Sequence, residues 1–205
     1  MEIGKIVCVE IDAPQVVLIS GSMFSGKSKR LIDIIDSFKE NNKEVLIFKP
    51  KLDKRDLGVV KSRDYDKTYD AYLIGDGKHP NFKQGYLDTV DAIVVDEAQF
   101  LDKRALYYVL GLQKGYNVPV IFAGLDKDFK GEEFSIITKI KKEKPLEINL
   151  RAKCFICGEL SARQSRRVID NKIVLEGDQV LCGDKESYIA VCSICDKNLM
   201  EGRGR

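Results

Sequence analysis

The clearest chemical signature in the sequence is a short glycine-rich segment that fits the pattern G-x-x-x-x-G-K-[ST] at every fixed position. Its eight residues are Gly21, Ser22, Met23, Phe24, Ser25, Gly26, Lys27 and Ser28. Glycines let the backbone N–H groups of such a loop turn inward onto an anion, and a helix that starts beside it directs its positive end to the same point. Lys27 adds a cation for the β- and γ-phosphates, and the Ser28 hydroxyl is suited to ligate Mg²⁺. We therefore predict a nucleoside triphosphate site rather than a chance turn that caps a helix.

A second chemical signature is the acidic pair Asp96-Glu97, which follows the apolar run 92–95. In a fold with a phosphate loop, an Asp that closes a buried strand is expected to contact Mg²⁺, often through water. Glu97 is the natural candidate to take a proton from an acceptor hydroxyl or to orient a water molecule. The alternative is a solvated helix N-terminus, where the helix dipole favours acids. The string D-E-A-Q is also found in helicases, but 205 residues are too few for the two motor domains of a helicase.

Two C-x-x-C pairs form the third signature, Cys154 with Cys157 and Cys192 with Cys195. Each pair can place two thiolates on one metal ion, and together they complete a tetrahedral site with four sulfur ligands, which is typical of Zn²⁺. The intervening segment, 158–191, is longer than the usual spacing of about 15–20 residues in zinc sites. A redox pair would be expected once and at a helix start, so we predict structural zinc that closes the base of a large loop.

The elements that must position these groups follow from apolar patterning. Continuous apolar runs predict buried parallel strands at 15–20, 44–48, 91–95 and 118–123. Helical spacing predicts helices at 29–39 and 102–114. Between these, we expect a long polar loop from 52 that ends in an edge strand at 69–74, a short helix at 81–87 and a loop at 124–134.

The alternation of strands and helices predicts an α/β fold, a P-loop NTPase (RecA-like) parallel sheet flanked by helices. Near residue 145 the amino-acid composition changes, and Cys, Gly, Ser and Arg become prominent. We therefore expect two domains, an ATP-binding α/β domain at 1–150 and a small zinc-ribbon domain at 151–205.

Composition sets the outer limits on function. Lys+Arg 34 against Asp+Glu 32 gives a net charge of only +2, and the interspersed charges argue against a dedicated nucleic-acid surface. No run approaches the roughly 18 apolar residues of a membrane helix, and residues 1–12 lack the apolar core of a signal peptide. Six cysteines without an export signal favour reduced thiols or metal ligands, so we expect a cytoplasmic protein with no membrane partner.

Taken in order, these motifs resemble those of the type II thymidine kinases over residues 15–196. The phosphate loop is close to that of the family, including the Met23-Phe24 pair that generic phosphate loops lack. Further matches are Lys49-Pro50 with Asp53 and Arg55, the stretch with Ser62 and Arg63, the G-L-D…D-F-x-G-x-x-F loop at 124–134, and the E-x-Y segment 186–188 before Cys192.

The resemblance implies a thymidine kinase that transfers the γ-phosphate of ATP to the 5′-hydroxyl of thymidine, or of deoxyuridine, to give dTMP in pyrimidine salvage. It implies that Glu97 is the general base, that Lys27 and Arg55 stabilise the transferred phosphoryl group, and that Ser28 and Asp96 serve Mg²⁺. Gln99, in the same acidic motif, joins the nucleotide-binding set.

For the nucleoside, the resemblance implies a base pocket lined by Met23, Leu125 and Phe129, with Phe129 stacked on the pyrimidine. The loop between the cysteine pairs, here called the lasso (158–191), closes over the nucleoside, with Tyr188 near the sugar. Members of the family are typically homotetramers.

The chain departs from the family pattern at several positions, namely Ser22, Leu101, Gln164, Asp184 and Ser193. Gln164 stands where a Thr or Ser usually contacts the base, and Ser165 follows it. Two other functions therefore stay open: a kinase of the same fold with a different base preference, and a zinc-ribbon P-loop ATPase that binds nucleic acid through Arg163, Arg166 and Arg167. The second lacks the interleaved aromatic residues of a base-stacking platform.

Overall fold

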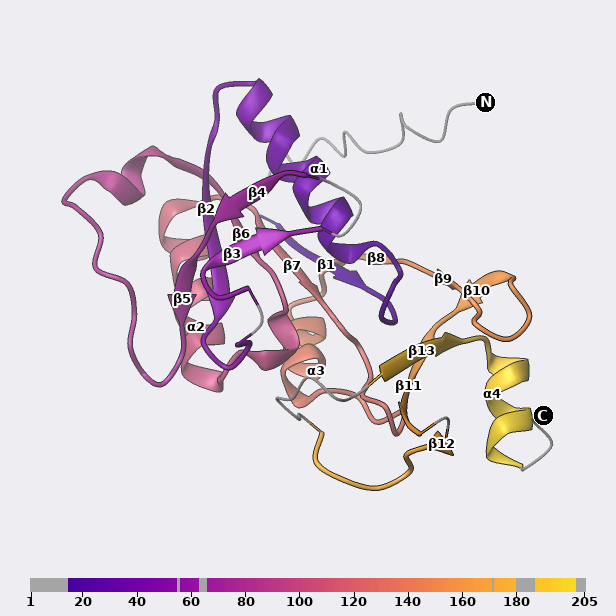
Figure 1. The fold of residues 1–205 in the computed structure, drawn as a ribbon. Helices are drawn as coiled ribbons and strands as arrows, with labels where there is room; N and C mark the ends of the chain where they lie inside the picture. The colour runs from indigo at the N-terminus through magenta and orange to yellow at the C-terminus, as the bar shows by residue number, and fades with distance from the viewer. Residues whose placement is uncertain (1–14, 55, 63–65, 171, 180–186, 202–205) are drawn as a thin grey trace.

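A six-stranded sheet forms the centre of the computed structural model, which describes residues 15–201 apart from 55, 63–65, 171 and 180–186 (Figure 1). The strand order is β5-β2-β6-β7-β1-β8, and all neighbouring strands are parallel. The strands are β1 Val16–Ser20, β2 Glu44–Pro50, β5 Tyr72–Ile74, β6 Val90–Val95, β7 Val120–Gly124 and β8 Leu146–Asn149. The four predicted buried strands are β1, β2, β6 and β7, so the parallel α/β prediction is confirmed.

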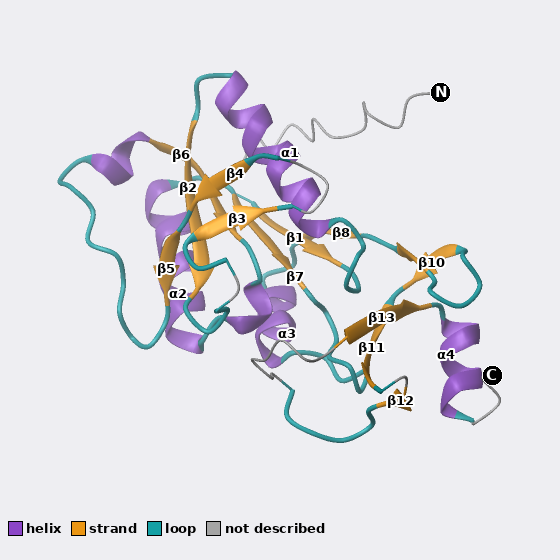
Figure 2. Cartoon of the chain, in the orientation of Figure 1, coloured by secondary structure: helices purple, strands orange, loops and turns teal. Residues whose placement is uncertain are grey.

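Helices cover both faces of this sheet, as Figure 2 shows. Helix α1 (Lys27–Glu40) packs on one face, where its Leu31 and Ile35 join Val17 and Ile19 of β1. Helices α2 (Lys103–Tyr116) and α3 (Ser135–Lys142) pack on the other face, which Leu18 of β1 enters. Successive strand residues point to opposite faces, so a strand that is covered on both sides must be apolar throughout. Within the described ranges, none of the helices has the length and apolar character needed to cross a membrane.

Three connections differ from the sequence expectations. The expected polar loop from residue 52 contains an antiparallel hairpin of β3 (Val59–Lys61) and β4 (Thr68–Asp70) before β5. The prediction of a helix at 81–87 is wrong. The segment contains only the start of a 3₁₀ turn, Tyr86–Thr89, which follows Gly85 at φ 80°. Helix α3 and the sixth strand, β8, follow the loop 124–134 and were not predicted.

The C-terminal part, here called the cysteine module (151–201), lies beside the carboxyl ends of β1 and β7 (Figure 1). Its bounds are β9 Ala152–Lys153, β10 Leu160–Ala162, β11 Gln164–Ile169, β12 Lys172–Ile173, β13 Ser187–Val191 and α4 Ser193–Met200. Strands β9 and β10 form one antiparallel pair, and β12-β11-β13 form a small antiparallel sheet. Its buried apolar cluster is small and includes Cys154, Cys192 and Cys195.

Candidate active site

The phosphate loop connects the end of β1 to the start of α1, in the context that its sequence predicts. Glycine is required at both glycine positions of the loop pattern, for different reasons. A Cβ on Gly21 would lie 2.6 Å from the Leu150 carbonyl oxygen and 2.7 Å from the Ser25 hydroxyl. Gly26 caps α1 at φ 84°, a left-handed conformation that side chains disfavour. The loop can therefore wrap tightly around a ligand only with these two glycines.

The interior of the loop is suited to an anion. The Lys27 ammonium donates to the carbonyl oxygens of Gly21 (3.0 Å) and Ser22 (2.8 Å), which holds its charge inside the loop. The buried Ser25 hydroxyl has no hydrogen-bond partner among the described residues. The N-terminus of the 14-residue helix α1 adds its partial positive charge at the same point. A phosphate would satisfy all three features.

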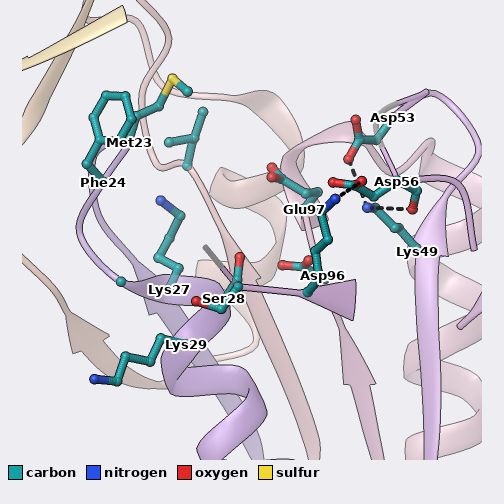
Figure 3. A pocket seen from close by; sticks show the side chains of 14 residues that line it. Met23, Phe24, Lys27, Ser28, Lys29, Lys49, Asp53, Asp56, Asp96 and Glu97 are labelled. Atoms are coloured by element: carbon teal, nitrogen blue, oxygen red, sulfur yellow. Dashed lines mark hydrogen bonds and ion pairs between the residues drawn. The ribbon is translucent and has the colours of Figure 1, made fainter. Parts of the chain in front are cut away.

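The acidic pair stands at the carboxyl end of β6, across the pocket from Lys27 and Ser28 (Figure 3). Asp96 is 5% exposed, and its burial and the adjacent Glu97 carboxylate raise its pKa to about 7. The Lys49 and Lys27 cations oppose this rise in pKa. A bound cation would offset the same cost of burial, so the site favours a positive ligand at Asp96. Glu97 has φ 51°, a left-handed value that is uncommon for residues other than glycine. This conformation turns the backbone after Asp96.

Gln99 holds the Glu97 carboxylate in place. Its side chain is 4% exposed and makes two hydrogen bonds in opposite senses. Its Oε1 accepts from the Leu125 backbone N–H at 3.0 Å, and its Nε2 donates to Glu97 Oε2 at 2.5 Å. The first bond fixes the amide orientation, so the second always presents an N–H to the carboxylate. A Cβ on Gly124 would lie 2.6 Å from Gln99 Oε1, so this arrangement also depends on a glycine.

These groups line a pocket of about 300 Å³ at the carboxyl edge of the sheet (Figure 3). Its charged lining consists of four lysines and four acids: Lys27, Lys29, Lys49, Lys61, Asp53, Asp56, Asp96 and Glu97. Met23, Phe24 and Leu125 supply its apolar lining. The pocket thus brings together the phosphate loop, the two carboxylates at the end of β6 and a small apolar surface.

Lys49 is a site residue whose role the sequence did not reveal. It is 4% exposed at the end of β2, and its ammonium lies 3.4 Å from Asp53 Oδ2. The same ammonium donates to the carbonyl oxygens of Asp56 and Val59, each at 3.1 Å. The sequence signal for this role was a lysine at the end of a buried strand, because a buried ammonium group needs hydrogen-bond or ion-pair partners. The contacts tie the segment after β2 to the sheet beside Asp96.

The other residues predicted for the nucleoside pack behind the pocket wall. The Met23 backbone N–H donates to Ser165 Oγ at 2.8 Å, and Ser22 Oγ donates to the Ala162 carbonyl at 3.3 Å, so the cysteine module contacts the phosphate loop directly. Gln164 Nε2 instead donates to the carbonyl oxygens of Asp128 (2.8 Å) and Ser165 (2.9 Å). Thus Ser165, and not Gln164, presents its side chain to the phosphate loop.

Phe129 and Tyr188 meet at a buried arginine that the prediction did not single out for the site. Phe129 is 2% exposed, and the Arg167 guanidinium carbon lies 3.8 Å from its ring centroid. Arg167 Nε donates to the Tyr188 hydroxyl at 3.1 Å. Neither aromatic ring lines the pocket itself.

Several predicted residues cannot be placed. Arg55, Arg63, Asp184 and Glu186 lie outside the described residues.

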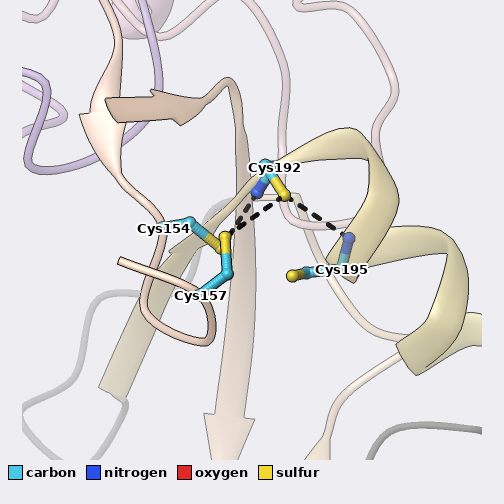
Figure 4. A group of neighbouring side chains, drawn as sticks. All are labelled: Cys154, Cys157, Cys192 and Cys195. Carbon is cyan, nitrogen blue, oxygen red and sulfur yellow. Dashed lines mark hydrogen bonds between the residues drawn. The ribbon is translucent and has the colours of Figure 1, made fainter. Parts of the chain in front are cut away.

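The four cysteines of the two C-x-x-C pairs converge on one point, as Figure 4 shows. All four are free thiols, and their sulfur atoms lie within 4.8 Å of one another. Four sulfurs about 2.3 Å from a central Zn²⁺ would stand about 3.8 Å apart, and Cys157 Sγ lies 3.8 Å from Cys192 Sγ. The four thiols are not equivalent without a metal: burial and backbone N–H donors act in opposite directions on Cys154 with a net lowering of its pKa, whereas the hydrogen bond with Cys192 and burial raise the pKa of Cys195 to about 12. The cluster therefore fits a metal with four thiolate ligands.

Comparisons with known proteins agree with this geometry. A family model described as thymidine kinase matches residues 14–196. A thymidine kinase of Mycoplasma capricolum is 33% identical over 182 residues, which are 87% of this chain and 86% of that protein. A thymidine kinase of Pseudothermotoga lettingae is 33% identical over 89% of this chain and 95% of its own. One of Mycoplasma genitalium is 34% identical over 86% of this chain and 80% of its own.

Two solved structures resemble the chain distantly. A DNA replication initiation factor matches 68% of this chain with 16% identity and a TM-score of 0.42, and the match spans 41% of that protein. DnaA from Aquifex aeolicus, bound to AMPPCP, matches 66% of this chain with 14% identity and a TM-score of 0.40, over 40% of its own length. We draw no functional conclusion from similarity at this level.

Proposed function

This chain belongs to the thymidine kinase family, and we propose from its geometry that it transfers the γ-phosphate of ATP to the 5′-hydroxyl of thymidine. The observation that supports this most is the pocket that joins Lys27 and Ser28 to Asp96 and Glu97, with Met23 and Leu125 alongside. A phosphoryl donor fits its phosphate loop and a nucleoside its small apolar surface. The carboxylate at the end of β6 is where an acceptor hydroxyl must lose a proton.

The phosphate loop would hold the donor. The N–H groups at the start of α1, the Ser25 hydroxyl and the Lys27 ammonium would bind the β- and γ-phosphates. Ser28 and Asp96 would hold Mg²⁺, which neutralises charge on the phosphates when it is bound. We assign Arg55 a role on the transferred group from the resemblance of its segment alone.

Glu97 would act as the general base. The 5′-oxygen forms a bond to the γ-phosphorus, the bond from that phosphorus to the bridging oxygen of ADP breaks, and the 5′-hydroxyl proton passes to the Glu97 carboxylate. Gln99 supports this role because its hydrogen bond to Oε2 fixes the direction of the Glu97 carboxylate. We therefore propose Gln99 as a positioning residue rather than a nucleotide contact.

The nucleoside would lie between the phosphate loop and the cysteine module. Met23 and Leu125 would contact the base, with Phe129, Gln164, Ser165 and Tyr188 forming the support behind them. Closure of this side would exclude water, which otherwise hydrolyses ATP. Deoxyuridine is expected as a second acceptor, because one methyl group provides only about 1–3 kcal/mol of discrimination.

We further propose Zn²⁺ as the metal of the cysteine cluster and domains divided near residue 150. A metal there would anchor both ends of the lasso, since one cysteine pair precedes it and the other ends it. We also propose a homotetramer, on family resemblance, with no nucleic-acid or membrane partner. The cytoplasm is the proposed compartment, because the described cysteines are free thiols and a reducing environment maintains them.

The test is an assay with Mg-ATP and a panel of nucleosides that scores nucleoside monophosphate and free phosphate separately. We expect dTMP from thymidine, a slower reaction with deoxyuridine, and little product from deoxycytidine or purine deoxynucleosides. A product from another base would indicate a kinase with a different base preference. Free phosphate without any nucleotide product would instead support an ATPase and would refute the proposal.

A further inference from the structure

Arg167 has the bulkiest side chain among the described residues that are fully buried, with 1% exposure. It does not belong to the apolar core of the parallel sheet but lies on β11 of the cysteine module. Removing a guanidinium from water is unfavourable unless well-placed partners compensate for it. A buried cation of this kind therefore needs partners that compensate for its lost hydration.

Among the described residues, Arg167 has partners in the loop after β7, on β13 and in the segment after β12. The guanidinium carbon of Arg167 lies 3.8 Å from the ring centroid of Phe129, in the loop after β7. Its Nε donates to the Tyr188 hydroxyl on β13 at 3.1 Å. Its Nη2 donates to the carbonyl oxygen of Asp178, in the segment 174–179 after β12, at 3.2 Å. One side chain thus links the loop after β7, strand β13 and the segment after β12.

The strand register places the Arg167 side chain on the face of the small sheet that is turned toward the phosphate loop. Arg167 pairs with Tyr188 and Ser165 pairs with Ala190, so Arg167, Tyr188 and Ser165 share one face. Ser165 accepts from the Met23 N–H, and Met23 lines the pocket. Gln164 and Arg166, on the opposite face, instead bind the backbone carbonyls of Asp128 and Phe129.

The chemistry of the contacts explains why this residue is arginine. A planar guanidinium can stack on an aromatic ring and, in the same position, donate several hydrogen bonds within its own plane. Lysine keeps the charge but offers no plane, and leucine fills volume without donating. The segment after β12 also comes close here, since a Cβ on Gly177 would lie 3.5 Å from Arg167 Nη1.

We propose that Arg167 is the positioning residue of the nucleoside side of the site: it holds Phe129, Tyr188 and the segment 174–179 after β12 as one wall. It does not line the pocket, so it acts through those partners rather than by touching substrate. This inference rests on the proposed thymidine kinase function. It implies that loss of Arg167 weakens nucleoside binding and leaves the ATP side and the phosphoryl-transfer groups unaffected.

The experiment compares steady-state kinetics of the wild-type protein with Arg167→Leu and Arg167→Lys. The matched control is Arg163→Leu, which removes the same charge from an exposed position in the same segment. We expect Arg167→Leu to raise the KM for thymidine about tenfold or more, with the KM for ATP and kcat within about twofold of the wild type. Arg167→Lys should give an intermediate KM, and the control should match the wild type.

Thermal unfolding with each ligand separately provides the second readout. The stabilisation by ATP should persist in Arg167→Leu and the stabilisation by thymidine should be lost, because only the wall for the nucleoside is altered. If the leucine variant fails to fold, Arg167→Lys carries the test with the same expected split.

The outcomes separate the two hypotheses. A wild-type protein that does not phosphorylate thymidine overturns the proposed function and this inference with it. An active wild type combined with an unchanged thymidine KM in both variants overturns the role of Arg167 alone. An equal rise in both KM values would show a general structural role and would also overturn it.

Discussion

The parallel sheet and the cysteine module reach a folded state by different physical means. The sheet buries long apolar strands between helices on both faces, and its residues at zero exposure are almost all aliphatic. The module has a small apolar cluster and relies on a four-cysteine cluster and two buried arginines. Arg166, for example, makes bonds of 2.6 and 2.8 Å to the two carboxylate oxygens of Asp196 on α4.

This difference indicates that the two regions contribute differently to the proposed reaction. The sheet provides a rigid platform for the phosphate loop and the Asp96-Glu97 pair, which need fixed geometry for phosphoryl transfer. The module has polar contacts and a cysteine cluster that fits a metal, and we expect that these can be disturbed without unfolding the sheet. We expect changes in the sheet to affect turnover, and changes in the module to affect the nucleoside.

The largest effect is expected from Glu97→Gln, which tests the platform. The amide cannot accept the 5′-hydroxyl proton, so kcat should fall by about 10²–10⁴-fold while ATP binding persists. Steady-state kinetics and a direct ATP-binding measurement check this. Glu147→Gln, at an exposed position on β8, is the control and should retain full activity. Near wild-type turnover in Glu97→Gln would remove Glu97 from the role of base.

The next largest effect should come from loss of one metal ligand, which tests the module. Cys157 is exposed, so Cys157→Ser removes a ligand with little loss of packing. Metal binding on the order of 10 kcal/mol drives the folding of comparable sites. Hydrogen exchange should therefore show lost protection in 151–201 and retained protection in the sheet, with ATP binding preserved.

Ser193→Ala is the control for this change, because it lies beside a ligand without being one. Its exchange pattern should match the wild type. Equal loss of protection in the sheet and in the module of Cys157→Ser would contradict the comparison between the two regions.

A smaller effect is expected from Gly124→Ala, which sharpens the comparison within the sheet. The new Cβ would meet Gln99 Oε1 at 2.6 Å and displace the amide that holds Glu97. We expect kcat to fall about tenfold, with stability reduced by about 1–3 kcal/mol and the KM for thymidine little changed. A rise in KM with normal kcat would show that Gln99 does not position Glu97.

The smallest effect should come from Asp102→Ala, at the start of α2 and away from the pocket. Asp102 accepts from the Ala105 N–H at 2.8 Å, and its loss as a helix cap should cost about 1 kcal/mol of stability without changing the kinetics. That hydrogen bond, with others, lowers the pKa of Asp102.

The sign of the pH dependence follows from this lowered pKa. The contribution of Asp102 is complete above its unfolded pKa of about 3.9 and is lost as the pH falls through the lower folded value. Thermal unfolding of the wild type and Asp102→Ala at neutral pH and near pH 2 should therefore show the difference shrink in acid. A constant difference would contradict the cap.

The sequence predicted the central strands of the sheet better than its edge, because only the central strands are covered on both faces. Strands β1, β2, β6 and β7 are buried on both faces, so each reads as a continuous apolar run. Strand β8 is an edge strand with exposed residues, so it gives no continuous apolar run. Helix α3 is amphipathic, with Ile136, Ile137 and Ile140 buried, but its eight residues are too short a window for the pattern to be read with the others.

The candidate site divides in the same way. The phosphate loop and the cysteine pairs have fixed local spacing and were predicted from it. The bond from Gln99 to Leu125 joins residues far apart in the chain, and local patterns do not encode it. The side of β11 that carries Arg167 depends on strand register, and a shift of one residue would have placed Arg166 there instead.

The most direct test of the account is the stoichiometry of the purified protein with Mg-ATP and thymidine, measured as dTMP and ADP formed in the same reaction. A pocket that joins a phosphoryl donor to a nucleoside and excludes water predicts dTMP and ADP in equal amounts. ADP and free phosphate without dTMP would contradict it, because the phosphate loop would then serve hydrolysis and the cysteine module would not present a nucleoside to Glu97.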